Sequence, residues 1–561
     1  MAHLDLAHVS YRLQDGRELL RDVSFRVGEG SRTALIGPNG GGKTTLTRLI
    51  EGEIQPTAGA ISVGGPLAVM RQSIGRDSGA ASVRSLLAST QPSHVRRAAQ
   101  GLLEAEVAMA QLGTEPSQMA FAQAVADWAD VGGYQVEALW DECCAVALGQ
   151  PLDEAERRAA GTLSGGEQKR LVLEALLRGE APLLLLDEPD NFLDVPAKRW
   201  LEARLLATNK TVLLISHDRE LLARCAQRIV TLEDGVCWVH GESFAEYPQA
   251  RHDRHQRQGE VLRRWTEERE RLRSLVRTLR EQARISEALA SRYHAAETRL
   301  RHFEEAGPPP APPRSQAVQM RLGGGRTGVR ALVCEQLELP GLIRPFDLEV
   351  FFGERVAVLG ANGTGKSRFL ELLAQGGAAP NQAETGDRPA WSGSCRLGAR
   401  VVPGYFAQSF DVRAPGAGRT LSGILAEDCS LGRGARMSAL RRYELDAQAD
   451  QLLETLSGGQ KARFEILRLE LSGATMLVLD EPTGNLDLVS AQALEDGLRD
   501  FRGTVVAVTH DRWFARPFTR FVVFDQDSTV CEASEARWDL AKGHQRPGAP
   551  ARLNHPPPRF D

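Results

Sequence analysis

The chain has 561 residues, of which 42% are hydrophobic and 25% charged, and its formal net charge at pH 7 is −5. This length predicts more than one domain, and the composition is typical of a soluble globular protein with sizeable cores. A mildly acidic chain has no general attraction to nucleic acid, so any basic surface must be local.

Membrane and secretion signals are missing from the sequence pattern. No apolar run reaches about 18 residues, the length that a membrane span requires. The first ten residues lack the basic and apolar regions of a secretion signal. The eight cysteines show no CxxC spacing, which favours reduced core thiols over a metal site. We therefore expect a cytoplasmic protein without a membrane span of its own.

The first predicted elements lead into a phosphate-binding loop. Leu4–Val27 alternates apolar and polar residues, which predicts an antiparallel sheet. A buried strand is predicted over Thr33–Ile36, and a Gly-x4-Gly-Lys-Thr motif follows it. Its glycines let backbone N–H groups surround phosphates, and the next helix adds its positive N-terminus. The loop residues are Gly37, Pro38, Asn39, Gly40, Gly41, Gly42, Lys43, Thr44 and Thr45.

A long stretch then recurs later in the chain in the same register. After a helical pattern over residues 73–162, an LSGG turn begins at Leu163, and a buried apolar strand ends in Asp187-Glu188. Ser164 to Asp187 is 23 positions, as is Ser457 to Asp480; Asp187 to His217 is 30 positions, as is Asp480 to His510. Such a repeat predicts two copies of one domain. A single Gly-rich turn before a helix could be structural, but a repeated one favours phosphate binding.

Between the copies, residues 251–306 predict two antiparallel helices. Apolar residues fall at helical spacing, and the turn is expected within 281–291. Eight arginines stand between Arg271 and Arg301 against three glutamates. Such a charge run is most often a solvated face, but a one-sided arginine row near a hairpin tip favours binding of a phosphate backbone. The candidates are Arg273, Arg277, Arg280 and Arg284.

The second copy follows a Pro-rich spacer at 307–313 and a Gly run at 323–325. Its strand from Arg355 feeds a second phosphate loop, and the tail beyond Ala536 has no periodicity and is expected to be disordered. The second loop contains Gly360, Ala361, Asn362, Gly363, Thr364, Gly365, Lys366 and Ser367. The predicted organisation is α/β, with nucleotide-binding domains over 1–247 and 330–536, a helical hairpin and spacer over 248–329, and a tail over 537–561.

These motifs resemble those of an ATP-binding-cassette protein with two cassettes in one chain. Each copy has the phosphate loop, a later glutamine, the LSGG signature, the Walker B pair, a D-loop aspartate (Asp194, Asp487) and a switch histidine. The resemblance implies that the cassettes pair head to tail around two ATP molecules, each facing the other cassette's signature. One site would use Lys43, Thr44, Gln72, Asp187, Glu188 and His217 with Ser457, Gly458 and Gly459. The other would use Lys366, Ser367, Gln408, Asp480, Glu481 and His510 with Ser164, Gly165 and Gly166.

The resemblance also implies a role for each group. Asp187 and Asp480 would hold Mg²⁺ together with Thr44 and Ser367, and Glu188 and Glu481 would polarise the attacking water. Tyr11 is placed to stack on adenine in the first site, whereas residues 332–344 offer no aromatic to the second. We expect both sites to hydrolyse ATP.

Twin cassettes joined by a helical hairpin resemble the ABC-F family, whose members bind ribosomes. That likeness implies an ATPase that inserts its hairpin toward the peptidyl-tRNA, in protection from antibiotics or in translation control, with rRNA and tRNA as partners and a monomer sufficient. DEPDNFLD and DEPTGNLD depart from the family's usual DEPTNHLD. The alternatives are a twin ATPase that energises separate membrane subunits, and a DNA-repair or chromosome ATPase. The basic hairpin and the two intact glutamates disfavour the former, and the absence of cysteine pairs disfavours the latter.

Overall fold

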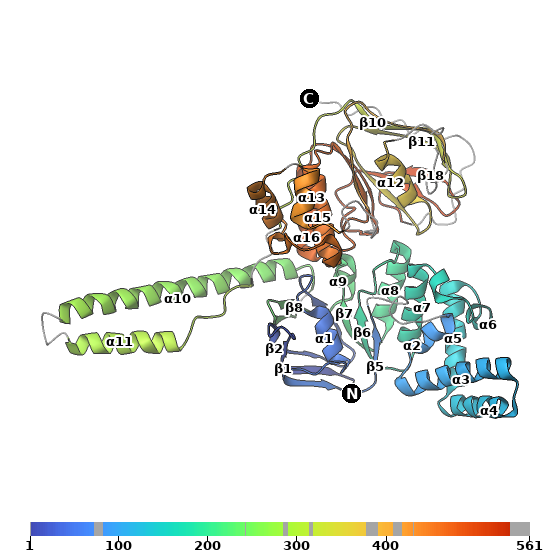
Figure 1. Cartoon of the computed structure of the whole chain (residues 1–561), viewed down its shortest axis with the longest axis horizontal. Helices are drawn as coiled ribbons and strands as arrows, with labels where there is room; N and C mark the ends of the chain where they lie inside the picture. Colours follow the sequence, from blue (N-terminus) through green and yellow to red (C-terminus); the bar gives the residue numbers. More distant parts are fainter. Residues whose placement is uncertain are drawn as a thin grey trace. The chain divides into compact units, whose positions relative to one another are not determined.

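The computed structural model describes residues 2–71, 82–241, 243–283, 290–313, 318–376, 391–407, 418–429 and 431–538. The chain forms two compact units. Met1–Trp238 and Ala317–Asp561 make up the first unit, which holds both repeated cassettes, and Val239–Gln316 makes up the second (Figure 1).

The first cassette contains two sheets and a set of helices. Its strands are β1 (Leu4–Arg12), β2 (Glu18–Val27), β3 (Arg32–Ile36), β4 (Ala58–Val63), β5 (Leu67–Met70), β6 (Leu183–Asp187), β7 (Thr211–Ile215), β8 (Arg228–Glu233) and β9 (Val236–His240). Its helices are α1 (Lys43–Ile50), α2 (Val83–Ser89), α3 (Ser93–Leu112), α4 (Glu115–Asp130), α5 (Gly133–Leu148), α6 (Leu152–Ala155), η1 (Ala160–Thr162), α7 (Gly165–Arg178), α8 (Val195–Ala207) and α9 (Arg219–Cys225).

The second cassette repeats this plan. Its strands are β10 (Arg330–Leu339), β11 (Ile343–Phe351), β12 (Arg355–Gly360), β13 (Ser392–Leu397), β14 (Pro403–Phe406), β15 (Met476–Asp480), β16 (Thr504–Val508), β17 (Arg520–Phe524) and β18 (Val530–Ala533). Its helices are α12 (Lys366–Ala374), α13 (Leu421–Asp428), α14 (Arg433–Arg442), η4 (Asp446–Gln448), η5 (Leu453–Thr455), α15 (Gly458–Leu471) and α16 (Leu488–Asp500).

The two main sheets have matching strand order. One runs β5-β6-β7-β3-β8-β9 and the other β14-β15-β16-β12-β17-β18. The phosphate-loop strand lies between the strand that leads to the switch histidine and the next strand, and it is parallel to both. All five residues of β6 and of β15 are buried, which is why both read as continuous apolar runs. Because parallel strands end at one edge, the loop, Asp-Glu pair and histidine of each cassette converge there.

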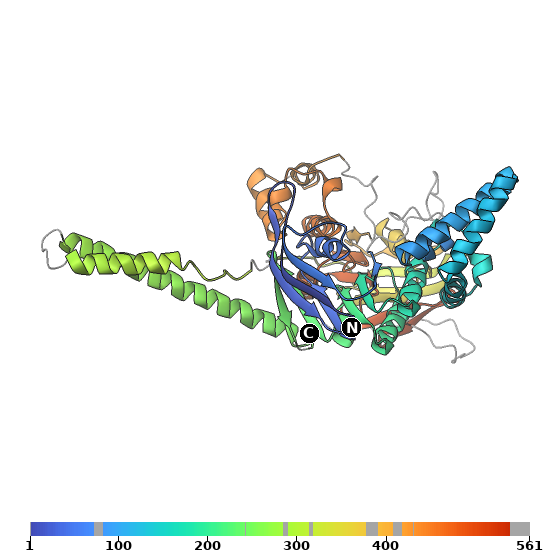
Figure 2. The same ribbon diagram turned by 90° about the horizontal axis from the view of Figure 1, so that it is seen from below.

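The helical part differs between the cassettes. The first has the α3–α4 pair, joined by two residues, between its main sheet and its signature helix, whereas the described part of the second has only α13 and the shorter α14 before η4 and η5 (Figures 1 and 2). The described part of the stretch 73–162, which was predicted to be helical, is helical, and its α3–α4 pair has no described counterpart in the second cassette.

The second unit is a helical hairpin. Helix α10 (Tyr247–Ala283) and helix α11 (Ala290–Glu305) lie side by side (Figure 2), and the predicted turn falls largely at 284–289, outside the described residues. Trp265 stacks on Phe303 with ring centroids 5.4 Å apart, and Leu272 and Ala296 are buried. Leu275 also stands at helical spacing from Leu272, but it is 45% exposed.

The segment between the Pro-rich spacer and the Gly run packs into the core of the second cassette. Val318, Met320 and Leu322 are buried there among residues of α13, α15 and α16, so the segment around the Gly run is packed rather than a free linker. Trp538, in the expected tail, is also buried in this core. Residues 539–561 lie outside the described part of the chain.

Candidate functional site

In both phosphate loops the lysine at the end of the loop donates hydrogen bonds to loop carbonyl groups. Lys43 Nζ donates to the carbonyls of Gly37 at 2.8 Å and Pro38 at 3.1 Å. Lys366 Nζ does the same with Gly360 at 2.9 Å and Ala361 at 2.5 Å. A Cβ on Gly37 or Gly360 would collide with a carbonyl of the neighbouring strand, so only glycine fits where each loop leaves its strand.

The two lysines lie in similar electrostatic surroundings. Burial lowers the pKa of both, while nearby carboxylates oppose that effect. For Lys43 the opposing groups are Glu188, Asp487 and Asp187, and for Lys366 they are Glu481, Asp194 and Asp480. Each lysine is therefore influenced by the D-loop aspartate of the opposite cassette.

The loop of each cassette contacts the D-loop of the other. The Asn39 N–H donates to Asp487 Oδ2 at 3.3 Å, and its amide donates to the Asn485 carbonyl at 3.2 Å. Asn362 mirrors this, donating to Asp194 Oδ2 at 3.4 Å and to the Phe192 carbonyl at 3.0 Å.

The signature turns lie in the same two places. Asn39 Nδ2 leaves no room for a side chain at Gly459, and Asn362 Nδ2 would lie 3.6 Å from a Cβ at Gly166. The first phosphate loop thus faces the second signature, and the second loop faces the first. This is the head-to-tail pairing that the sequence resemblance predicted.

Each signature serine begins a helix. The Ser164 hydroxyl accepts from the Glu167 N–H at 3.2 Å, and the Ser164 N–H donates to the Glu167 carboxylate at 2.7 Å. Ser457 makes the same reciprocal cap with Gln460. Such a box fixes the first turn of α7 and α15, whose remaining N–H groups favour an anion.

The Walker B aspartates have the surroundings of a cation site. Burial, followed by the neighbouring Glu188, raises the pKa of Asp187 to about 7. Burial also raises the pKa of Asp480, although a hydrogen bond with Ser367 and the charge of Lys366 oppose the change. Among the described residues Asp480 Oδ1 is buried without a hydrogen-bond partner. A buried carboxylate oxygen of this kind fits a divalent cation, because the ion would supply the missing charge.

The two glutamates share an unusual backbone conformation. Glu188 and Glu481 have φ of 50° and 48°, a left-handed region that costs a non-glycine residue about 1–3 kcal/mol. Glu188 Oε2 accepts from the Asn191 amide at 2.6 Å, and Glu481 Oε2 accepts from the His510 N–H at 3.1 Å. Burial raises the pKa of Glu481 to about 7.

The switch histidines are held neutral. Burial, then the charge of Lys43, lowers the pKa of His217 to about 3, while Asp487 opposes the shift. Burial, then Lys366 and Lys198, lowers the pKa of His510. Both ring nitrogens of His217 are buried without a hydrogen-bond partner within the described ranges. A neutral ring nitrogen that carries a proton could donate a hydrogen bond to a phosphate oxygen of a bound nucleotide.

The structure leaves some predicted residues untested. Gln72, Gln408 and Arg284 lie outside the described residues. Tyr11 is half-buried on β1 and pairs in register with Leu20, whereas the corresponding pair of the second cassette is Leu339 with Ile343. An aliphatic side chain thus stands where the first cassette has its aromatic ring, and weaker adenine binding at the second site stays a prediction.

The sequence did not predict two buried ion pairs between the cassettes. Arg219 lies 3.0 Å from Glu495, and Arg512 contacts Glu202. The arginines directly follow the aspartate after each switch histidine, and each glutamate stands eight positions beyond a D-loop aspartate. The two arginines occupy corresponding positions of the repeat, and so do the two glutamates. Comparison of the copies could therefore have identified both pairs.

Comparison with known proteins agrees with this geometry. The family model described as "ABC transporter" matches residues 20–191 and 343–484. An antibiotic resistance protein of Mycobacteroides abscessus is 54% identical, with 96% of this chain and 100% of that protein aligned. The tylosin resistance ATP-binding protein TlrC of Streptomyces fradiae is 31% identical over 92% of this chain and 96% of its own. The chain is an ABC-F protein.

A more distant relative and a solved structure extend the comparison. The energy-dependent translational throttle protein EttA of Mycobacterium tuberculosis is 27% identical over 94% of this chain and 91% of its own. A chain in the structure of ribosome-bound archaeal Pelota and ABCE1 matches with a TM-score of 0.52 and 18% identity, over 92% of this chain and 76% of its own. That match supports the tandem-cassette fold.

Family membership establishes the activity. This ABC-F protein is an ATP hydrolase with two ABC domains. Among the described residues no helix is long and apolar enough to cross a membrane.

Proposed function

We propose that this ABC-F protein is an ATP-driven clamp that binds the ribosome and protects it from antibiotics. The mirrored contacts of Asn39 with Asp487 and of Asn362 with Asp194 carry the proposal. They put each phosphate loop against the opposite D-loop and signature, so a nucleotide held by one cassette would bridge both. Binding energy at either site would then favour the closed arrangement.

Each composite site would use residues from both cassettes. Lys43 or Lys366 would move from the loop carbonyls to the β- and γ-phosphates, and the opposite signature helix would face the γ-phosphate. Mg²⁺, held near Thr44 and Asp187 or near Ser367 and Asp480, would neutralise developing phosphate charge. The carboxylate of Glu188 or Glu481 would orient the attacking water and accept its proton. His217 or His510, neutral at the site, would donate a hydrogen bond to the γ-phosphate.

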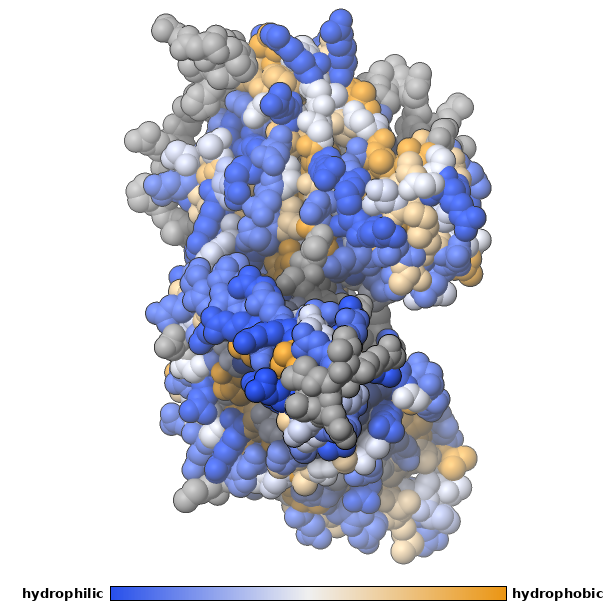
Figure 3. Space-filling view, turned by 90° about the vertical axis from the view of Figure 1, so that its left-hand side faces the viewer, coloured by the Kyte–Doolittle hydropathy of each residue, from blue (hydrophilic) through white to orange (hydrophobic). Residues whose placement is uncertain are grey.

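The hairpin would contact ribosomal RNA. Arg277 and Arg280 are exposed on α10, where phosphates could reach them, whereas Arg273 pairs with Glu304 at 2.7 Å and instead ties the two helices together. Hydrophilic residues cover most of the face drawn in Figure 3. The names of the relatives, which include resistance proteins and a translational throttle, support a ribosomal role. The reaction would therefore take place in the cytoplasm, where translating ribosomes lie.

The test uses the double variant Glu188→Gln/Glu481→Gln, which should bind ATP without hydrolysing it. We expect it to co-sediment with ribosomes in ATP but not in ADP. Arg277→Glu/Arg280→Glu should abolish this binding, because two side chains that attract phosphates would be replaced by two that repel them. The matched control is Arg263→Glu on the same helix, which is 69% exposed and pairs with Glu267.

A second arm tests resistance. Expression of the wild-type chain should raise the inhibitory concentration of a ribosome-targeting antibiotic, and the double glutamine variant should not. Ribosome binding without any resistance would replace protection by translation control. No binding in either nucleotide would discard the ribosomal role and direct the search to membrane partners.

A further inference from the structure

The two cassettes differ in charge at corresponding buried positions. Lys198 stands four residues after the D-loop Asp194, where the second cassette has Ala491 after Asp487. Asp190 stands two residues after Glu188, where the second cassette has Thr483 after Glu481. Only the first cassette therefore has an ionic pair at these positions. Buried charges are costly unless they are paired and hydrogen-bonded, so their presence calls for an explanation.

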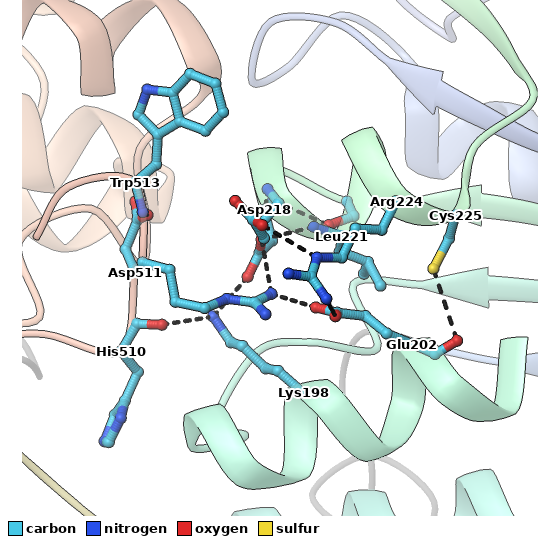
Figure 4. Close-up of polar contacts among 12 residues, drawn as sticks. Lys198, Glu202, Asp218, Leu221, Arg224, Cys225, His510, Asp511 and Trp513 are labelled. Atoms are coloured by element: carbon cyan, nitrogen blue, oxygen red, sulfur yellow. Dashed lines mark hydrogen bonds and ion pairs between the residues drawn. The ribbon is translucent and has the colours of Figure 1, made fainter. Parts of the chain in front are cut away.

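Lys198 connects the cassettes directly. Its Nζ lies 2.8 Å from Asp218 Oδ2 in its own cassette and donates to the His510 carbonyl of the other at 3.2 Å (Figure 4). Lys198, Asp190 and Asp218 are each 9% exposed or less. The contact is therefore shielded from water. In such a low-dielectric interior a charge-assisted hydrogen bond is strong.

The anchor of Lys198 is rigid. Asp218 Oδ1 accepts from the N–H groups of Glu220 and Leu221 at the start of α9, and its other oxygen holds Lys198. Burial lowers the pKa of Lys198, but Asp218 and Asp190 outweigh this effect and raise it above its ordinary value. The ammonium group thus stays charged and points at the opposite cassette.

We propose that Lys198 is a positioning residue that acts across the interface and fixes His510 and Glu481 at the second ATP site. His510 is held on both sides, because its N–H donates to Glu481 Oε2 at 3.1 Å and its carbonyl accepts from Lys198. Ala491 has no group that could do this for His217. The second site therefore depends on the first cassette in a way that has no counterpart at the first site. This inference rests on the proposed assignment of His510 and Glu481.

The test gives the first cassette the residues of the second. Asp190→Thr/Lys198→Ala removes one carboxylate together with the ammonium group, and Asp218 keeps Arg512 at 3.9 Å. ATP turnover is measured in the Glu188→Gln background, which reports the second site, and in the Glu481→Gln background, which reports the first. We expect kcat to fall about tenfold or more in the former, as for a misplaced catalytic group, and to change less than about twofold in the latter.

Two further variants separate positioning from folding. Lys198→Arg keeps the charge and a donor and should restore most of the turnover. Lys210→Ala is the matched control, because Lys210 donates to the Leu176 carbonyl of its own cassette at 3.0 Å, and it should leave the second site unchanged.

Amide exchange of the full chain gives a readout besides activity. Asp190→Thr/Lys198→Ala should speed exchange over 509–513, whereas Lys210→Ala should not. Should either glutamine background lose all turnover, this measurement decides. Equal losses at both sites, or unchanged exchange at 509–513, would overturn the proposal. If Glu481→Gln failed to slow hydrolysis, the site assignment itself would be wrong; loss of ribosome binding alone would leave the inference intact.

Discussion

Glu188 and Glu481 show how single residues store conformational strain at the sites. Both adopt positive φ directly after a fully buried strand, and each backbone N–H is held by the neighbouring strand, at Ile215 and Val508. The sheet thus holds each glutamate in this strained conformation. A strained residue at a reaction centre is pre-organised for one orientation.

The buried histidines predict how stability depends on pH. His217 is neutral in the folded chain down to pH about 3, against an ordinary pKa of 6.5. Between these values the unfolded chain binds a proton that the folded chain does not, so the free energy of unfolding falls as the pH drops through this window. We expect His217→Gln to flatten the decline of Tm between about pH 6.5 and 4. Melting scans with His294→Gln, an exposed histidine of the hairpin, as control would check this; parallel curves for wild type and His217→Gln would refute it.

At the scale of the element, α10 and α11 are held by few apolar contacts. The stack of Trp265 on Phe303, the buried Leu272 and the ion pair of Arg273 with Glu304 join them. Most other side chains of these helices are exposed. The pair therefore has little core of its own, and each aromatic contact carries a large share of its stability.

Removing that stack should loosen the hairpin. An aromatic pair contributes about 0.5–1.5 kcal/mol beyond its buried area. Trp265→Ala should therefore speed amide exchange in α10 and α11 by about tenfold. Leu275→Ala on the same helix is the control, because Leu275 is 45% exposed and should change exchange little. Similar exchange in both variants would show that the stack is not what joins the helices.

At the scale of the whole molecule, corresponding positions of the two cassettes meet each other. Arg219 pairs with Glu495, Arg512 with Glu202, Asn39 with Asp487 and Asn362 with Asp194. A repeated sequence can produce such paired contacts because each interface residue occurs twice. Lys198 is an exception, because its counterpart Ala491 has no charge.

Reversing one buried ion pair should weaken cassette pairing. Arg219 and Glu495 are 7% and 9% exposed, and breaking a buried pair costs about 3–5 kcal/mol. We expect Arg219→Glu to lower ATP turnover strongly and Arg219→Glu/Glu495→Arg to recover part of it. Arg516, which is 55% exposed, pairs with Glu220 across the interface, so Arg516→Glu serves as control with an effect of about 1 kcal/mol or less. A double variant no better than Arg219→Glu would exclude pairing as the cause.

Much of this protein follows from local sequence. The phosphate loops, the signature turns, the all-apolar Walker strands and the hairpin could be predicted, because helical and strand periodicities and glycine-rich turns are local properties. The matching register of the two copies also predicted that one domain occurs twice in tandem. The helical pattern over residues 73–162 predicted helices there but not the pairing of α3 with α4. Apolar spacing shows that Leu272 and Leu275 share a helix face, but not how deeply each is buried against the partner helix.

Only the tertiary structure decided what the charged residues do. Arg273 belongs to a row of arginines in the sequence, yet it binds Glu304 across the hairpin. Lys198 and His510 are 312 positions apart, and no periodicity links them. A local pattern determines which element forms, whereas a contact between distant side chains depends on how whole domains pack. The sequence by itself therefore determined two ATP-binding cassettes and a helical hairpin, and the packing of those cassettes decided which buried charges meet.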